Sequence, residues 1–136
     1  MNEQEVRDGA QIALALLAAG PVDTRDESSL AKLVAGSEQW GLGVPRPEQI
    51  VHGFYALTVR GLASVAGHGI ALSREGRLQI SHAVDVAPNR NAAQYATFDI
   101  VAKTPRCVAV QAPHPSIERL RAAIDRYASR GESARA

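Results

Sequence analysis

The feature that most constrains this fold is a change of hydrophobic period near the middle of the chain. From Ile50 to Val65, apolar residues recur at helical spacing and form one wide apolar face, which predicts a helix ended by the glycines at 67 and 69. Beyond this point the period falls to two. Residues 77–86 alternate, which predicts a half-buried antiparallel strand with these side chains on its apolar face: Leu78, Ile80, His82, Val84 and Val86.

Two further helices are predicted ahead of this one. Asn2 and Glu5 form a plausible capping pair for the first helix, and Gly20-Pro21 stops it. A second helix is predicted to begin near Ser28 or Ser29 and to end before the glycines at 41 and 43. Pro47 suits the first position of the third helix, because its missing N–H is not needed there.

The remaining strands are short. Residues 69–73 are predicted to form a strand, and residues 74–76 a turn. A further short strand is predicted at residues 107–111. It begins at Cys107, which we interpret as a small buried core residue. Residues 95–102 predict a strand. A helix competes there, because Ala92 and Ala93 favour helix.

A last amphipathic helix follows Ser116, a good N-cap, and Gly131 is predicted to close it. We therefore expect an α+β fold with three N-terminal helices, an antiparallel β-meander of about four strands and a C-terminal amphipathic helix. One globular domain over residues 1–131 and a flexible tail over 132–136 are expected.

Composition excludes several classes of protein. The single cysteine excludes an internal disulfide framework and a multi-cysteine zinc site within one chain. The acidic, polar start is unlike a signal peptide, and the apolar run at residues 12–19 is too short to cross a bilayer. A cytoplasmic protein without membrane contact is expected. The net charge of +1 lacks the basic excess typical of proteins that bind duplex DNA.

No residue pattern indicates a catalytic, metal or cofactor site, and none is predicted. His82 is the most informative titratable residue, because it falls on the apolar face of the predicted strand. One interpretation is a histidine at the edge of the core. The other is an acid/base or ligand-binding residue in a pocket between the sheet and the third helix, lined also by Tyr55 and Tyr95.

A nucleic-acid hypothesis rests on the order of the elements. Three helices followed by a hairpin at residues 70–81 resemble a winged-helix arrangement, with Arg74 and Arg77 on the wing and Arg60 on the preceding helix. The long connection between the second and third helices argues against a tight helix-turn-helix. Arg119 and Arg126 on the last helix form either a solvated face or a docking surface for an anionic partner.

The leading hypothesis is a non-catalytic binding or assembly subunit. Its partner would be another copy of the chain or a different protein. The small-residue helix faces, the edge strands and the arginines of the last helix are all usable in such contacts. A winged-helix-like DNA-binding regulator and a small enzyme or ligand-binding protein with a pocket near His82 remain the alternatives.

Overall fold

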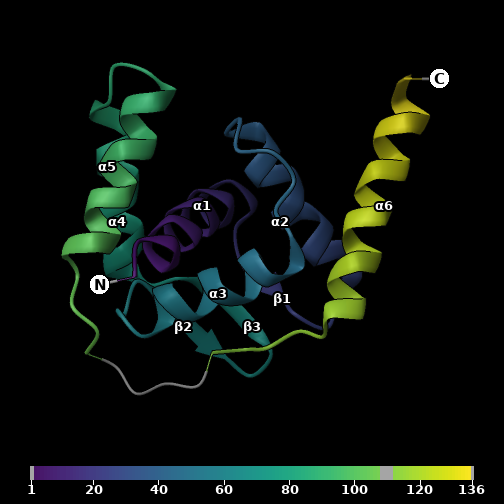
Figure 1. Cartoon of the computed structure of the whole chain (residues 1–136), viewed down its shortest axis with the longest axis horizontal. Coiled ribbons are helices and arrows are strands. Elements are labelled where there is room, and N and C mark those ends of the chain that lie inside the picture. Colours follow the sequence, from purple (N-terminus) through teal and green to yellow (C-terminus); the bar gives the residue numbers. More distant parts are fainter. Residues whose placement is uncertain (1, 108–111, 136) are drawn as a thin grey trace.

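A computed structural model describes residues 2–107 and 112–135 of the chain (Figure 1). The predicted α+β class is confirmed, with a predominance of helix. The elements, in chain order, are α1 (Glu3–Ala19), β1 (Val22–Asp23), α2 (Glu27–Gln39), α3 (Pro47–Thr58), β2 (Ala63–Ala66), β3 (Gly69–Leu72), α4 (Arg74–Val86), α5 (Arg90–Lys103) and α6 (Ile117–Arg135).

Helix α1 lies at the centre of the molecule and packs against α2, α3 and α5. Its N-cap is Asn2, as predicted, whose side chain accepts hydrogen bonds from the backbone of Gln4 and Glu5. The largest buried side chain is Phe54 of α3, and α1 contributes an unbroken buried run at residues 12–16. The core therefore sits where α1 crosses the other N-terminal helices.

The three strands form one antiparallel sheet in the order β1-β3-β2. Val22 pairs with Ile70, and Ala63 pairs with Leu72 across the β2–β3 hairpin. Strand β1 lies between α1 and α2 in the chain, so the first six elements run helix, strand, helix, helix, strand, strand. The hairpin lies at residues 63–72, so the predicted hairpin at residues 70–81 is wrong in its position.

The third helix is shorter than predicted. It ends at Thr58, and Gly61 then adopts a φ of +70°, which turns the chain into β2. Leu62 and Val65, predicted on the helix, lie in the turn and in the strand instead.

The alternating segment 77–86 is helix α4, so the predicted strand is wrong. Ser73 caps this helix by accepting a hydrogen bond from the backbone N–H of Gly76 at 3.0 Å. Residues 74–76, predicted as a turn, are its first residues. A Cβ on Gly76 would overlap the backbone of Leu62, so a glycine is needed for this close approach.

Residues 95–102 are also helical, within α5, so the competing helix replaces the predicted strand. The side chain of Asn89 accepts from the backbone N–H of Ala92 at 2.9 Å and begins this helix. The predicted strand at 107–111 lies mostly outside the described residues. Cys107 itself is exposed, which contradicts its predicted burial.

Helix α6 begins as predicted, with the Ser116 hydroxyl accepting from the backbone of Arg119 at 3.1 Å. It continues to Arg135 and so passes Gly131, its predicted end. Figure 1 shows α6 alongside α2, on the side of the molecule opposite the α4–α5 pair. Among residues 2–107 and 112–135, no helix is both long and apolar enough to span a membrane.

Candidate interaction surfaces

Helix α4 presents an unusual outer face. Leu78 and Val86 have exposed fractions of 62% and 66%, and His82 between them is also exposed. At 3.6 residues per turn, positions 78, 82 and 86 form one stripe along the helix. We call Leu78, His82 and Val86 the α4 stripe. Arg74 and Asp85 are exposed along one edge of it.

The opposite face of α4 packs inward. Ile80 is fully buried, and Val84 is partly buried against the core. The helix is held against α5 and, to a smaller extent, against α1 and β3. Apolar residues therefore lie on both faces of α4, and only the inner face is covered.

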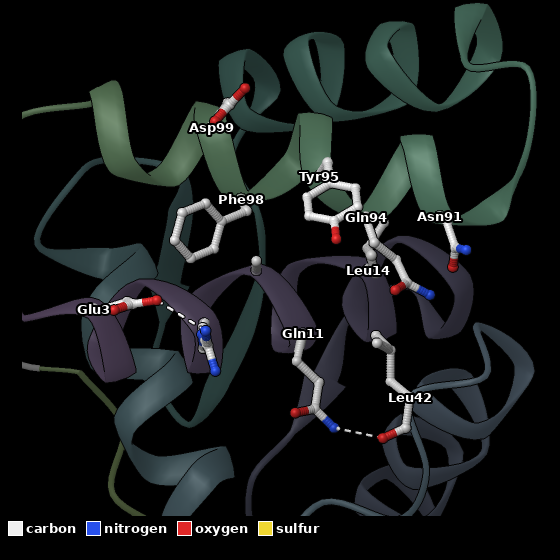
Figure 2. A pocket seen from close by; sticks show the side chains of 11 residues that line it. Glu3, Gln11, Leu14, Leu42, Asn91, Gln94, Tyr95, Phe98 and Asp99 are labelled. Carbon is white, nitrogen blue, oxygen red and sulfur yellow. Dashed lines mark hydrogen bonds and ion pairs between the residues drawn. The ribbon is translucent and has the colours of Figure 1, made fainter.

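A groove of about 640 Å³ runs between α1, α5 and the connection after α2 (Figure 2). Leu14, Leu42 and Phe98 supply apolar surface, and Tyr95, with an exposed fraction of 76%, stands at its edge. Gln11 donates a hydrogen bond to the carbonyl oxygen of Leu42 at 3.4 Å. The groove is only partly enclosed by these residues.

The surface that a winged-helix protein would turn towards DNA carries little positive charge. Helix α3 contains no Lys or Arg, and its exposed residues include Glu48, His52 and Tyr55. The tip of the β2–β3 hairpin is Gly67-His68. Arg46, the N-cap of α3, is the nearest cation in the sequence. This face therefore offers few contacts for phosphates.

Arg60, predicted to face DNA, is buried with only 5% of its surface exposed. Its Nε donates to the carbonyl of Val101 at 3.0 Å, and its Nη1 donates to the carbonyl of Ala56 at 2.9 Å. Its Nη2 lies 3.0 Å from Oε2 of Glu5. Arg60 therefore ties α1, α3 and α5 together and is not available to a nucleic acid.

Glu5 joins this ion pair to a second one. Arg106 donates a short hydrogen bond to Oε1 of Glu5. Burial raises the pKa of Glu5, but the contacts with Arg106 and Arg60 outweigh it and hold the pKa below its usual value. Glu5 in turn raises the pKa of Arg106. The cluster fixes the segment after α5 against the start of α1.

The carboxylate of Asp8, which is 2% exposed, has a polar neighbour at each oxygen. Gln4 donates to its Oδ1 at 2.9 Å, and Nδ1 of His52 lies 3.7 Å from its Oδ2. The side chain of His52 is 63% exposed, so the imidazole end of this pair lies at the surface. Within residues 2–107 and 112–135, no group of three or more His, Cys, Asp or Glu residues is arranged to hold a metal ion.

The predicted ligand-site residues do not come together. His82 is on α4, and Tyr55 is on α3, where the guanidinium of Arg106 lies 6.0 Å from its ring centre. Of the three, only Tyr95 lines the α1–α5 groove. The predicted pocket between the sheet and the third helix is therefore not formed by these residues.

The other predicted arginines occupy different surfaces. Arg74 and Arg77 are exposed on α4 rather than on the hairpin. Arg119 and Arg126 are exposed on α6, as predicted for its outer side. These four residues lie on helices at opposite sides of the molecule in Figure 1, so they do not form one basic surface.

Sequence reasoning missed the groove and the α4 stripe. The groove draws its residues from three separate segments, and no spacing along the chain brings Gln11, Leu42 and Phe98 together. The stripe had a sequence signal, because Ser73 followed by an acidic residue in the next turn is typical of a helix start. No protein-family model, curated protein or solved structure matches the chain.

Proposed function

We propose that this protein is a non-catalytic assembly subunit that associates with a second copy of itself through the outer face of α4. The observation that carries the proposal is the exposure of Leu78 and Val86 on one stripe of a helix whose other face is already packed. Three of the five large apolar side chains exposed in the described structure belong to the α4–α5 pair: Leu78, Val86 and Tyr95.

A helix at the surface of a single domain normally has one apolar face and one polar face. Helix α4 departs from this pattern, because Leu78 and Val86 point away from Ile80 and Val84. Apolar residues on two opposite faces are typical of a helix covered on both sides. A second copy of the chain would supply the missing cover.

Light scattering behind size exclusion, over a wide range of protein concentrations, tests this proposal. We expect a concentration-dependent dimer for the natural chain and a monomer for the double variant Leu78→Ser/Val86→Ser. Val44→Ser is the matched control, because Val44 is 43% exposed but lies on the α2–α3 connection. Circular dichroism verifies that each variant keeps its helices. A natural chain that stays monomeric at every concentration would refute the proposal.

One observation favours a second candidate function, a DNA-binding regulator: the winged-helix order of α1 to β3. Fold order alone does not establish function, and the low charge of the α3 face weighs against it. Arg74 and Arg77 lie on α4 and not on the hairpin, so substituting them does not test this hypothesis. The informative substitution is Arg46→Ala, at the start of α3.

Fluorescence anisotropy with a labelled duplex, measured over a series of salt concentrations, tests the DNA hypothesis. If Arg46 contacts a phosphate, Arg46→Ala lowers the slope of log affinity against log salt by about 0.9. The Arg74→Ala/Arg77→Ala variant would leave that slope unchanged. Failure of the natural chain to bind the duplex at low salt would eliminate this function.

A further inference from the structure

We propose that the groove between α1, α5 and the connection after α2 is a binding site for a small organic amine with an aromatic body. The groove shares no residue with the α4 stripe, so this proposal does not depend on self-association. Its volume of about 640 Å³ lies in the usual range of ligand pockets, which are mostly apolar and carry a few polar groups that orient the ligand. Here the polar groups select the class of ligand.

The amide of Gln11 presents a hydrogen-bond acceptor to the groove. Its Nε2 donates to the hydroxyl of Ser37 at 3.0 Å and to the carbonyl oxygen of Leu42 at 3.4 Å. The Ser37 hydroxyl donates its own proton to the carbonyl of Gly43 at 2.8 Å, so it must accept from Gln11. These contacts fix the orientation of the amide and leave Oε1 as its unused end.

Gln94 is oriented in the same way from α5. Its Nε2 donates to the carbonyl oxygen of Trp40 at 2.9 Å, and a carbonyl can only accept. Within residues 2–107 and 112–135, Oε1 of Gln11 and Oε1 of Gln94 accept no hydrogen bond, and neither atom is buried. Both amides line the groove, so a ligand that donates hydrogen bonds meets two acceptors that are already held in place.

The apolar surface of the groove fits an aromatic body. Leu14 and Leu42 supply aliphatic surface, and Phe98 and Tyr95 line the groove from α5 (Figure 2). The two aromatic residues are three positions apart, so they are neighbours on one face of the helix. Figure 2 shows the Tyr95 hydroxyl turned towards α1. Two adjacent rings favour contact with a flat apolar group, and their faces also attract a cation.

The charges of the groove favour a cation. Its charged lining residues are Glu3, Arg7 and Asp99, and Arg7 is already paired with Glu3 at 2.8 Å. Asp99, exposed at the outer edge, forms no ion pair with any residue that the structure describes, so one negative charge is left uncompensated. An alkylamine is protonated at pH 7 and carries N–H donors. An ammonium group therefore suits both the amide oxygens and the charge.

Nuclear magnetic resonance titration of the ¹⁵N-labelled chain with phenethylamine tests the site. This probe joins one aromatic ring to one ammonium group, and its small size predicts a dissociation constant of about 0.1–10 mM. We expect the side-chain amide signals of Gln11 and Gln94 to shift with one common dissociation constant. Phenylpropionate, which has a similar size and the opposite charge, is expected to bind at least about threefold more weakly. Equal binding of the two probes, or shifts confined to other parts of the chain, would overturn the proposal.

Substitutions of exposed residues separate the contributions without altering the core. Tyr95→Ala is expected to weaken phenethylamine binding about two- to fivefold, because the ammonium loses an aromatic neighbour. Tyr55→Ala is the matched control, since Tyr55 is exposed on α3 and does not line the groove. Asp99→Asn is expected to weaken binding by a similar factor at low salt, whereas Glu118→Gln on α6 leaves it unchanged. If Tyr95→Ala and Asp99→Asn both bind as tightly as the natural chain, the groove is not the site.

The requirement for N–H donors has its own measurement. Phenethyltrimethylammonium keeps the ring and the positive charge but has no N–H group. We expect it to bind about three- to tenfold more weakly than phenethylamine, because the amide oxygens of Gln11 and Gln94 are then left without a donor. Equal affinity of the two cations would show that these oxygens do not select the ligand and would overturn the assignment of its class.

Discussion

The ion-pair cluster at the start of α1 yields a prediction whose size follows from the structure. Glu5→Gln keeps the shape of the side chain but removes its negative charge. Arg60, whose side chain is 3% exposed, then loses its counter-ion, and Arg106 loses its hydrogen bond to a carboxylate. The substitution therefore leaves a buried guanidinium without a charged partner.

The cost of this change is bounded by what remains around Arg60. Removing one partner of a fully buried pair costs about 3–5 kcal/mol. Here the Glu5 side chain is 12% exposed, and Arg60 keeps its hydrogen bonds to the carbonyls of Ala56 and Val101. We therefore expect Glu5→Gln to lower the free energy of unfolding by about 2–3 kcal/mol at pH 7, which lowers Tm by about 6–15 °C for a chain of this length.

The effect of pH has a definite sign. Because the pKa of Glu5 is lower in the folded chain than in the unfolded one, its ionisation stabilises the fold above the unfolded pKa. This stabilisation is lost as the pH falls through the folded pKa and the carboxylate is protonated in both states. The difference between the natural chain and Glu5→Gln is therefore expected to shrink below about pH 4.5.

Urea unfolding monitored by the fluorescence of Trp40, the only tryptophan, measures these differences. Glu3→Gln is the matched control, because Glu3 is also in the first turn of α1 but pairs with Arg7 where both side chains are more than 60% exposed. Its expected cost is at most about 0.5 kcal/mol. If Glu5→Gln costs no more than Glu3→Gln at pH 7, the cluster does not stabilise the fold as argued.

Two further predictions concern the close approaches that shape the fold. Gly53→Ala would force a Cβ against Ile12 and to 2.8 Å from the carbonyl oxygen of Asp8. We therefore expect urea unfolding to show a free energy of unfolding lower by about 1–3 kcal/mol, despite the better helix propensity of alanine. A variant more stable than the natural chain would contradict this. Ser73→Ala removes the cap of α4 and the hydroxyl's 2.7 Å hydrogen bond to the carbonyl of Gly61. We expect a loss of about 1–2 kcal/mol and faster amide exchange at Gly76, and unchanged exchange would show that the cap is dispensable.

Four of the helices were predicted from local signals. The helices α1, α2, α3 and α6 were predicted from apolar periodicity and from residues such as Asn2, Pro47 and Ser116, whose effects act within one turn. The two-residue strand β1 was missed, because Val22-Asp23 is too short to show alternation and depends on pairing with β3. The sheet therefore depends on tertiary pairing that no local pattern in the sequence indicates.

The candidate site was predicted less well, because it depends on contacts between distant segments. Arg60 looked like a surface cation, and nothing in its local sequence indicated that Glu5 would pair with it. His82 was singled out for lying on an apolar face. It does lie between two apolar residues, but on the outside of a helix rather than on the inside of a sheet.

The error over residues 77–86 supports the assembly proposal. In an alternating segment, every second apolar residue is four positions from the last, which is about one helical turn. The alternation that resembled a strand therefore places Leu78, His82 and Val86 on one face of α4. It places Ile80 and Val84 on the opposite face. A helix that faces solvent typically carries polar residues on its outer side, and positions 78 and 86 depart from that pattern. A helix covered on two sides would produce the same strand-like alternation. If the Leu78→Ser/Val86→Ser variant is monomeric while the natural chain dimerises, the same residues account for both the misread sequence and the assembly.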